Sequence, residues 1–198
     1  MRKSQMIECV IFDMDGTVVD VPYDWKKIKE ELQTQGAPIL SYIQGLKEPE
    51  KSEKWKVLER FEVEATTQAV LKKGMREFLS FLERKKIKKI LVTNNSRRNV
   101  DFLLKKFNLE FDFILSREAG LWKPSGAPFL FVLKTLKLEK EKCCVIGDSH
   151  FDAKAAADAG IQSVYLLGTQ RQKDLPVGIQ IFQTVYDLHR WFERLIAQ

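Results

Sequence analysis

Two aspartates, Asp13 and Asp15, follow a short apolar run and are the residues of this chain best placed to do chemistry. The run, residues 9–12, is β-prone and lacks polar alternation, which predicts a buried strand with the aspartates at its C-terminal tip. Residues two apart in an extended chain point to the same side, so the carboxylates should lie close together and ionise at different pH values. One can act as nucleophile or metal ligand, and the other as general acid and base. The alternative is that both are ordinary turn residues, because aspartate and glycine are common in turns.

Other polar residues end later apolar runs. Thr93 and Asn94 end one run, and Asp148 ends another, with Asp152 four residues beyond it. Because ligands bind at the carboxyl ends of the strands in open parallel sheets, we expect these side chains to converge at one edge. Directly after the first aspartates, Gly16 permits a turn that a Cβ would hinder, and Thr17 adds a hydroxyl that can orient a neighbouring carboxylate.

The predicted edge is strongly acidic. It gathers four carboxylates, those of Asp13, Asp15, Asp148 and Asp152. Such a cluster is costly unless a cation neutralises it, and oxygen ligands without histidine or cysteine suit Mg²⁺. Lys123 can reach the same edge as a positive charge, while the Thr93 hydroxyl and the Asn94 amide can bind the oxygens of a phosphoryl group.

Strand-like runs alternate with amphipathic helical runs along most of the chain, which predicts a doubly wound parallel α/β sheet. We expect strands at residues 9–12, 89–93, 111–115, 143–147 and 163–167, and a short sixth at 179–181. We expect helices at residues 75–85, from an N-cap at Ser96 to 107, and at 129–136, 152–159 and 186–196.

Residues 20–72 interrupt this alternation. The spacing of apolar residues predicts helices at 24–33 and 50–72, glycines and prolines predict a loop-rich stretch between them, and no strand is expected. The predicted organisation is therefore a core made of residues 1–19 and 73–198, with a small helical insertion at 20–72.

Composition excludes several classes of protein. The 198 residues are 44% hydrophobic and 30% charged, as expected for a soluble protein with one core and an inserted subdomain. No apolar stretch has the length of a membrane span or forms a signal-peptide core, so we expect a cytoplasmic protein without a membrane partner. The three cysteines show no disulfide or zinc spacing. The net charge of +6 suits an anionic partner, but no nucleic-acid-binding motif appears and no nucleic-acid partner is expected.

Four short motifs occur in order. Residues 13–17 read Asp-Met-Asp-Gly-Thr, Thr93 ends an apolar strand, Lys123-Pro124 lies in a turn-rich loop, and residues 147–152 read Gly-Asp-Ser-His-Phe-Asp. They match the four signature motifs of the haloacid-dehalogenase-superfamily phosphohydrolases, from Asp-x-Asp-x-Thr to Gly-Asp-x-x-x-Asp. The chain resembles that superfamily over nearly its whole length. It departs from the pattern at Gly126, where relatives often have the second proline of Lys-Pro-x-Pro.

The resemblance implies a Rossmann-like core and a Mg²⁺-dependent phosphatase. Asp13 would attack the phosphorus atom to form an aspartyl-phosphate, and Asp15 would protonate the leaving oxygen and then deprotonate water. The implied metal ligands are Asp13, the backbone carbonyl of Asp15, and Asp148, with Asp152 as a further ligand or a partner of the ligands. The implied phosphoryl-binding residues are Thr93, Asn94 and Lys123.

The insertion at residues 20–72 resembles the helical cap of the phosphoglycolate-phosphatase and β-phosphoglucomutase branch, although it is short for that branch. In the superfamily that the chain resembles, members that cleave carbon–halogen or phosphorus–carbon bonds lack an acid at the position of Asp15. The resemblance therefore implies a phosphate ester, and we expect a small phosphorylated substrate such as phosphoglycolate or a sugar phosphate. One alternative is a phosphomutase, which would need a cap that excludes water. A second is a phosphatase for macromolecular substrates, which the small cap and basic core would suit. A third is a non-catalytic binding module, against which the complete set of catalytic residues counts. The sequence indicates no particular oligomeric state.

Overall fold

The computed structural model describes residues 7–168, 175 and 179–197. The chain forms two compact units, a larger one from the segments up to Asp20 and from Leu71 onward, and a smaller one, Val21–Val70. The interpretation of the smaller unit as a cap stays a prediction. In the described part of the chain, no helix combines the length and the apolar character needed to cross a membrane.

The larger unit is built on a six-stranded parallel sheet with the order β5-β4-β1-β6-β7-β8. The strands are β1 (Cys9–Phe12), β4 (Lys88–Val92), β5 (Phe113–Leu115), β6 (Cys143–Gly147), β7 (Ser163–Leu167) and β8 (Gln180–Phe182). β1 lies between β4 and β6 and all its residues are buried, which explains its uninterrupted apolar sequence. The predicted α/β parallel sheet is confirmed, with strand bounds within two residues of those expected.

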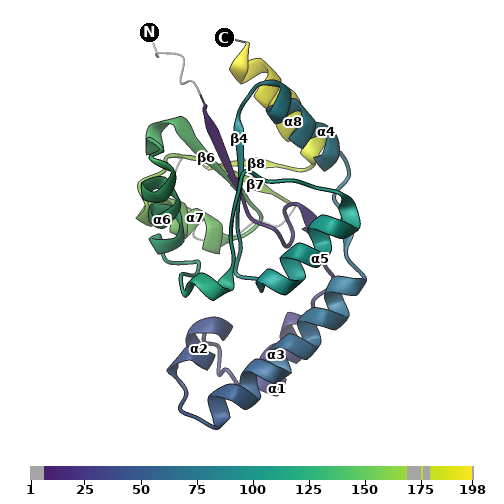
Figure 1. Ribbon diagram of the computed structural model, residues 1–198, viewed down its shortest axis with the longest axis vertical. Coiled ribbons are helices and arrows are strands. Elements are labelled where there is room, and N and C mark those ends of the chain that lie inside the picture. The colour runs from purple at the N-terminus through teal and green to yellow at the C-terminus, as the bar shows by residue number, and fades with distance from the viewer. Residues whose placement is uncertain (1–6, 169–174, 176–178, 198) are drawn as a thin grey trace. The chain divides into compact units, whose positions relative to one another are not determined.

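Helices cover both faces of this sheet (Figure 1). They are α4 (Met75–Arg84), α5 (Arg97–Phe107), α6 (Ala127–Leu136), α7 (His150–Asp158) and α8 (Val185–Ile196), with short 3₁₀ turns η1 (Arg117–Ala119) and η2 (Lys140–Lys142). On one face, Phe12 of β1 packs edge-on against Phe78 of α4, which in turn packs against Phe192 of α8. Its neighbour Ile11 points to the other face and lies in a core cluster with residues of α6 and α7.

Two helix starts shape the site. Ser96 caps α5 as predicted, because its side chain accepts a hydrogen bond from the Asn99 N–H at 3.3 Å. α7 begins at His150, two residues before the expected start. Ser149 and Asp152 form a capping box, in which the Ser149 side chain bonds to the Asp152 backbone and the Asp152 side chain to the Ser149 backbone.

The smaller unit contains α1 (Trp25–Leu32), α2 (Ile39–Gly45) and α3 (Glu50–Thr67). Its core is formed by apolar residues from all three helices, namely Ile28, Leu32, Ile43 and Leu58. The prediction of a loop at α2 was wrong, because a helix of seven residues that follows Pro38 and ends at Gly45 is too short to show a helical period. The expectation of no strand in residues 20–72 was also wrong, since β2 (Val19–Asp20) and β3 (Val70–Leu71) form a separate two-stranded sheet.

Candidate active site

The loop after β1 holds Asp13 and Asp15 in a tight turn. The carbonyl of Met14 accepts backbone hydrogen bonds from residues 17, 18 and 19, at 3.3, 2.9 and 3.1 Å. The backbone N–H of Asp13 donates to the Ile146 carbonyl of β6 at 2.9 Å. The bond to Ile146 fixes the backbone of Asp13 against the neighbouring strand, and the bonds to Met14 close the turn that contains Asp15.

Two glycines make room for carboxylates. Gly16 has a φ of +87°, and a Cβ there would lie 2.2 Å from Oδ2 of Asp148. A Cβ at Gly147 would lie 2.4 Å from Cγ of Asp152. Both positions therefore require glycine, one for its backbone conformation and both for close approach.

Three carboxylates, two from strand tips and one from the first turn of α7, come together. Asp13, Asp148 and Asp152 each offer a carboxylate oxygen, and these oxygens all lie within 4.8 Å of one another. The pKa of Asp148 is raised to about 8, first by burial and then by the charges of Asp13 and Asp152, while Lys123 opposes the rise. Burial likewise raises the pKa of Asp13 to about 6, against the lowering effect of Lys123. A divalent cation would relieve this repulsion, and oxygen donors of this kind suit Mg²⁺.

Lys123 lies inside the cluster. Its Nζ donates to Oδ1 of Asp13 at 2.5 Å and to Oδ1 of Asp152 at 2.6 Å, and its side chain is only 4% exposed. Burial alone would lower the pKa of this lysine, but the two carboxylates outweigh burial and raise its pKa. The ammonium group is therefore a fixed positive charge beside Asp13.

Asp152 is held through both carboxylate oxygens. Oδ2 accepts hydrogen bonds from the Ser149 hydroxyl at 2.7 Å, the Ser149 N–H at 3.2 Å and the Asp148 N–H at 3.3 Å. Oδ1 accepts from Lys123. We interpret Asp152 as the residue that ties the loop after β6 to Lys123.

The turn after β4 supplies the predicted phosphoryl-binding residues. Thr93 is buried, and its Oγ1 accepts from the Asn95 N–H at 3.0 Å. The side chain of Asn94 donates through Nδ2 to the carbonyl of Lys123 at 2.9 Å and accepts through Oδ1 from the Lys123 N–H at 3.0 Å. The structure thus uses the Asn94 amide to fix the backbone of Lys123, and its direct contact with phosphate stays a prediction.

Sequence reasoning missed Asn95. Its Nδ2 donates to both carboxylate oxygens of Asp15, at 3.0 and 3.3 Å. The only signal in the sequence was a second polar residue after Thr93. The hydroxyl of Thr17, expected to orient a carboxylate, is buried and has no hydrogen-bond partner among the described residues.

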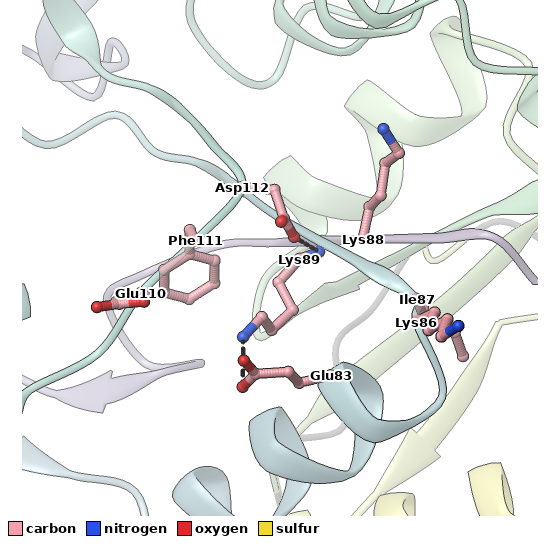
Figure 2. A pocket seen from close by; sticks show the side chains of 8 residues that line it. All are labelled: Glu83, Lys86, Ile87, Lys88, Lys89, Glu110, Phe111 and Asp112. Carbon is pink, nitrogen blue, oxygen red and sulfur yellow. Dashed lines mark hydrogen bonds and ion pairs between the residues drawn. The ribbon is translucent and has the colours of Figure 1, made fainter.

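A pocket of about 230 Å³ lies at the other end of β4 (Figure 2). It is lined by three lysines and three acidic residues, so its charges balance. The Nζ of Lys89 donates to Glu83 at 3.3 Å, and the Lys89 N–H donates to Asp112 at 2.7 Å. These bonds stabilise the fold. The candidate active site is therefore not this pocket but the C-terminal tip of β1, where the carboxylates converge.

A family model described as haloacid dehalogenase-like hydrolase matches residues 23–160. The chain belongs to this family. Membership confirms the resemblance that the four motifs indicated, and with it the expectation that the chain is a hydrolase.

Two of the proteins that are similar to this chain are named as phosphatases. The phosphorylated carbohydrates phosphatase of Thermotoga maritima is 30% identical over 184 residues, covering 80% of this chain and 84% of that protein. The phosphoglycolate phosphatase of Pseudomonas fluorescens is 25% identical over 185 residues, covering 79% and 68%. A haloacid dehalogenase-like hydrolase domain-containing protein of Arabidopsis thaliana is 28% identical over 153 residues, and the match spans 71% of this chain but only 62% of that protein.

Solved structures show the same fold. A hydrolase from Pseudomonas syringae superposes with a TM-score of 0.77 at 18% identity, covering 94% of this chain and 98% of that one. At this identity the likeness shows the fold alone.

Proposed function

We propose that this hydrolase cleaves phosphate monoesters of small metabolites through an aspartyl-phosphate formed on Asp13, with Mg²⁺ as cofactor. The observation that carries the proposal is the position of Asp13, against Lys123 and within 4.8 Å of the Asp148 carboxylate. An anionic nucleophile can approach an anionic phosphate only where positive charge offsets the repulsion. Lys123 supplies one such charge, and the acidic cluster can hold another.

The reaction divides into two displacements. In the first, a carboxylate oxygen of Asp13 attacks phosphorus, the bond to the ester oxygen breaks, and Asp15 gives that oxygen a proton so that it leaves as an alcohol. In the second, water attacks phosphorus, Asp15 takes its proton, and the bond to Asp13 breaks. Inorganic phosphate leaves and both aspartates return to their starting forms, with one water consumed.

The residues around Asp13 would bind the transferring group. Lys123 offers a charged donor, and Thr93 and the backbone of Asn94 lie in the neighbouring turn. The hydrogen bonds between Asn94 and Lys123 join these two phosphoryl-binding segments. Fixed donors of this kind stabilise developing charge without reorganising during the reaction.

The donor set fits Mg²⁺. Carboxylate oxygens of Asp13, Asp148 and Asp152 converge, and Gly16 leaves the space that a side chain would fill. We assign Asp13, Asp148 and the backbone carbonyl of Asp15 as ligands, and Asp152 as their partner because hydrogen bonds already occupy both its oxygens. When bound, the ion would neutralise charge on the phosphoryl group.

The relatives support a small substrate. The Thermotoga and Pseudomonas proteins are named for phosphorylated carbohydrates and for phosphoglycolate. We therefore propose that a sugar phosphate or a short phosphorylated acid is the substrate.

The test is phosphate release from a panel that holds sugar phosphates, phosphoglycolate, a phosphopeptide and a 5′-phosphorylated oligonucleotide, with Mg²⁺ or with a chelator. We expect Mg²⁺-dependent release that is fastest with a small ester, and phosphorus NMR should show free phosphate as product. An isomerised ester would instead show a mutase, and faster release from the peptide or oligonucleotide would show a macromolecular substrate. No turnover by the folded, Mg²⁺-binding protein would contradict the proposal.

A further inference from the structure

Asp15 and Asn95 join the loop after β1 to the turn after β4. We propose that Asn95 is a positioning residue that holds the Asp15 carboxylate in the orientation needed for proton transfer. The proposal rests on the function proposed above and adds a residue that none of the four motifs contains. It stands on the hydrogen bonds around one buried amide.

The orientation of the Asn95 amide is determined by its partners. Its Oδ1 accepts from the Ser96 backbone N–H at 2.8 Å and from Nδ2 of Asn99 at 2.9 Å. A backbone N–H can only donate, so the oxygen must face Ser96 and the NH₂ group must face Asp15. Asn95 therefore presents its NH₂ group to the carboxylate of Asp15. In the flipped orientation of the side-chain amide, this NH₂ group would face the Ser96 N–H, which is also a donor.

Asn95 is held on every side. It is 3% exposed and Asn99 is 5% exposed. The backbone N–H of Asn95 donates to Oγ1 of Thr93 at 3.0 Å, and the backbone carbonyl of Asn95 accepts from the Arg117 N–H at 3.0 Å. The side chain of Asn95 is thus fixed by the first turn of α5, and its backbone by the chain after β5. Together these contacts make Asn95 a rigid support.

A carboxylate bound in this way keeps the capacity that catalysis needs. An ionised carboxylate has about four acceptor positions, and the Asn95 amide takes part of that set. Proton exchange with an ester oxygen or with water uses one of these positions, so the amide that binds the same carboxylate fixes the direction in which the proton moves. Misplacing a catalytic group by about 1 Å can cost about 100-fold in rate, so an anchor on Asp15 would matter.

The test uses two esters that differ in their leaving group. An alkyl phosphate needs a proton on the departing oxygen, whereas p-nitrophenyl phosphate leaves as a stable anion. kcat/KM covers the steps up to departure of the leaving group. For Asn95→Ala we expect kcat/KM to fall about 100-fold with the alkyl ester and less than about threefold with the nitrophenyl ester.

A second signature appears in kcat. Hydrolysis of the aspartyl-phosphate still needs Asp15 as base, so Asn95→Ala should give a burst of nitrophenol followed by a slow steady state. Asn99→Ala leaves the Ser96 N–H on the amide oxygen, so it should show the same pattern with a smaller loss, about tenfold. If Asn95→Ala does not fold, the comparison of the two esters is made with Asn99→Ala instead. Equal losses with both esters, or no loss with either, would overturn the proposal.

The contact is also measurable without turnover. A double-mutant cycle in urea between Asn95→Ala and Asp15→Ala, with chelator present, should give unfolding constants that depart from multiplicative behaviour by about tenfold or more. A multiplicative cycle would overturn the contact and the proposal with it. If wild type cleaves neither ester, the proposed function and the positioning role fall together. If wild type is active and Asn95→Ala does not discriminate between esters, only the positioning role falls.

Discussion

Lys123 donates through Nζ to Oδ1 of Asp13 at 2.5 Å, across 110 residues of sequence. Their side chains are 4% and 11% exposed, so the pair is almost excluded from solvent. Asp152 accepts from the same amine and holds it in place. The positive charge that a phosphoryl group needs is therefore built into the fold beside the proposed nucleophile.

Removing that charge should damage both stability and activity. Lys123→Met leaves the buried carboxylates of Asp13 and Asp152 without their shared partner, so the free energy of unfolding at neutral pH should fall by about 3–5 kcal/mol. Phosphate release should fall by at least about 100-fold, because a fixed charge at the reacting group is lost. Urea denaturation and initial rates measure the two effects.

The matched control is Lys154→Met. Lys154 lies 4.0 Å from Asp158 at the surface, with its side chain 60% exposed. Such a pair contributes at most about 1 kcal/mol, so both measurements should stay near those of wild type. Equal effects of the two substitutions would contradict the role given to Lys123.

Gly16→Ala tests the packing between the first and fourth motifs. The positive φ alone should cost about 1–2 kcal/mol of unfolding free energy. The new Cβ would also meet Oδ2 of Asp148, so that carboxylate must move and Mg²⁺ affinity should fall, as isothermal titration would show. Gly120→Ala carries a similar φ of +71° but meets no atom within 4 Å. It should lose similar stability while keeping wild-type affinity for Mg²⁺, and a parallel loss of affinity would count against the clash.

The acidic cluster should make stability depend on pH. The pKa of Asp148 rises from 3.8 to about 8, and that of Asp13 from 3.8 to about 6. Below the unfolded pKa both groups are protonated in either state. As the pH rises, the two carboxyl groups lose their protons at lower pH in the unfolded chain than in the folded protein, where burial and repulsion between carboxylates oppose ionisation. With chelator present, the free energy of unfolding should therefore fall as pH rises from about 4 to about 8.

Asp148→Asn should flatten this pH dependence, because it removes the carboxyl with the larger rise in pKa. Adding Mg²⁺ to wild type should also flatten it, since the ion favours the ionised forms. Urea titrations at several pH values give both slopes. If the free energy of unfolding depends on pH with the same slope in wild type and Asp148→Asn in chelator, the pKa of Asp148 is not raised in the folded protein.

Much of the fold was predictable because its signals are local. An uninterrupted apolar run such as β1 must be buried, and an aspartate directly after it must lie at a strand tip. The convergence of Asp13 and Asp148 then follows from parallel strand topology alone. The β2–β3 pair was missed because each strand has two residues and their pairing is set by the tertiary fold.

The division of roles between Asn94 and Asn95 was beyond sequence reasoning. The two residues are adjacent and identical, yet one binds the backbone of Lys123 and the other the side chain of Asp15. Which way each amide points depends on the turn after β4 and on contacts 29 and 80 residues away. Asp152 shows the same limit, because the sequence predicted a carboxylate near the metal but not the capping box that occupies one of its oxygens.

The most direct test of the account is to trap the aspartyl-phosphate. Wild type and Asp13→Asn would be mixed with an ester labelled in its phosphoryl group, in the presence of Mg²⁺, and quenched in acid within the first turnover. We predict label on wild-type protein that hydroxylamine releases, peptide mapping that places it at Asp13, and no label on Asp13→Asn. Turnover by wild type without any labelled protein, or label that persists in Asp13→Asn, would contradict the assignment of Asp13 as nucleophile.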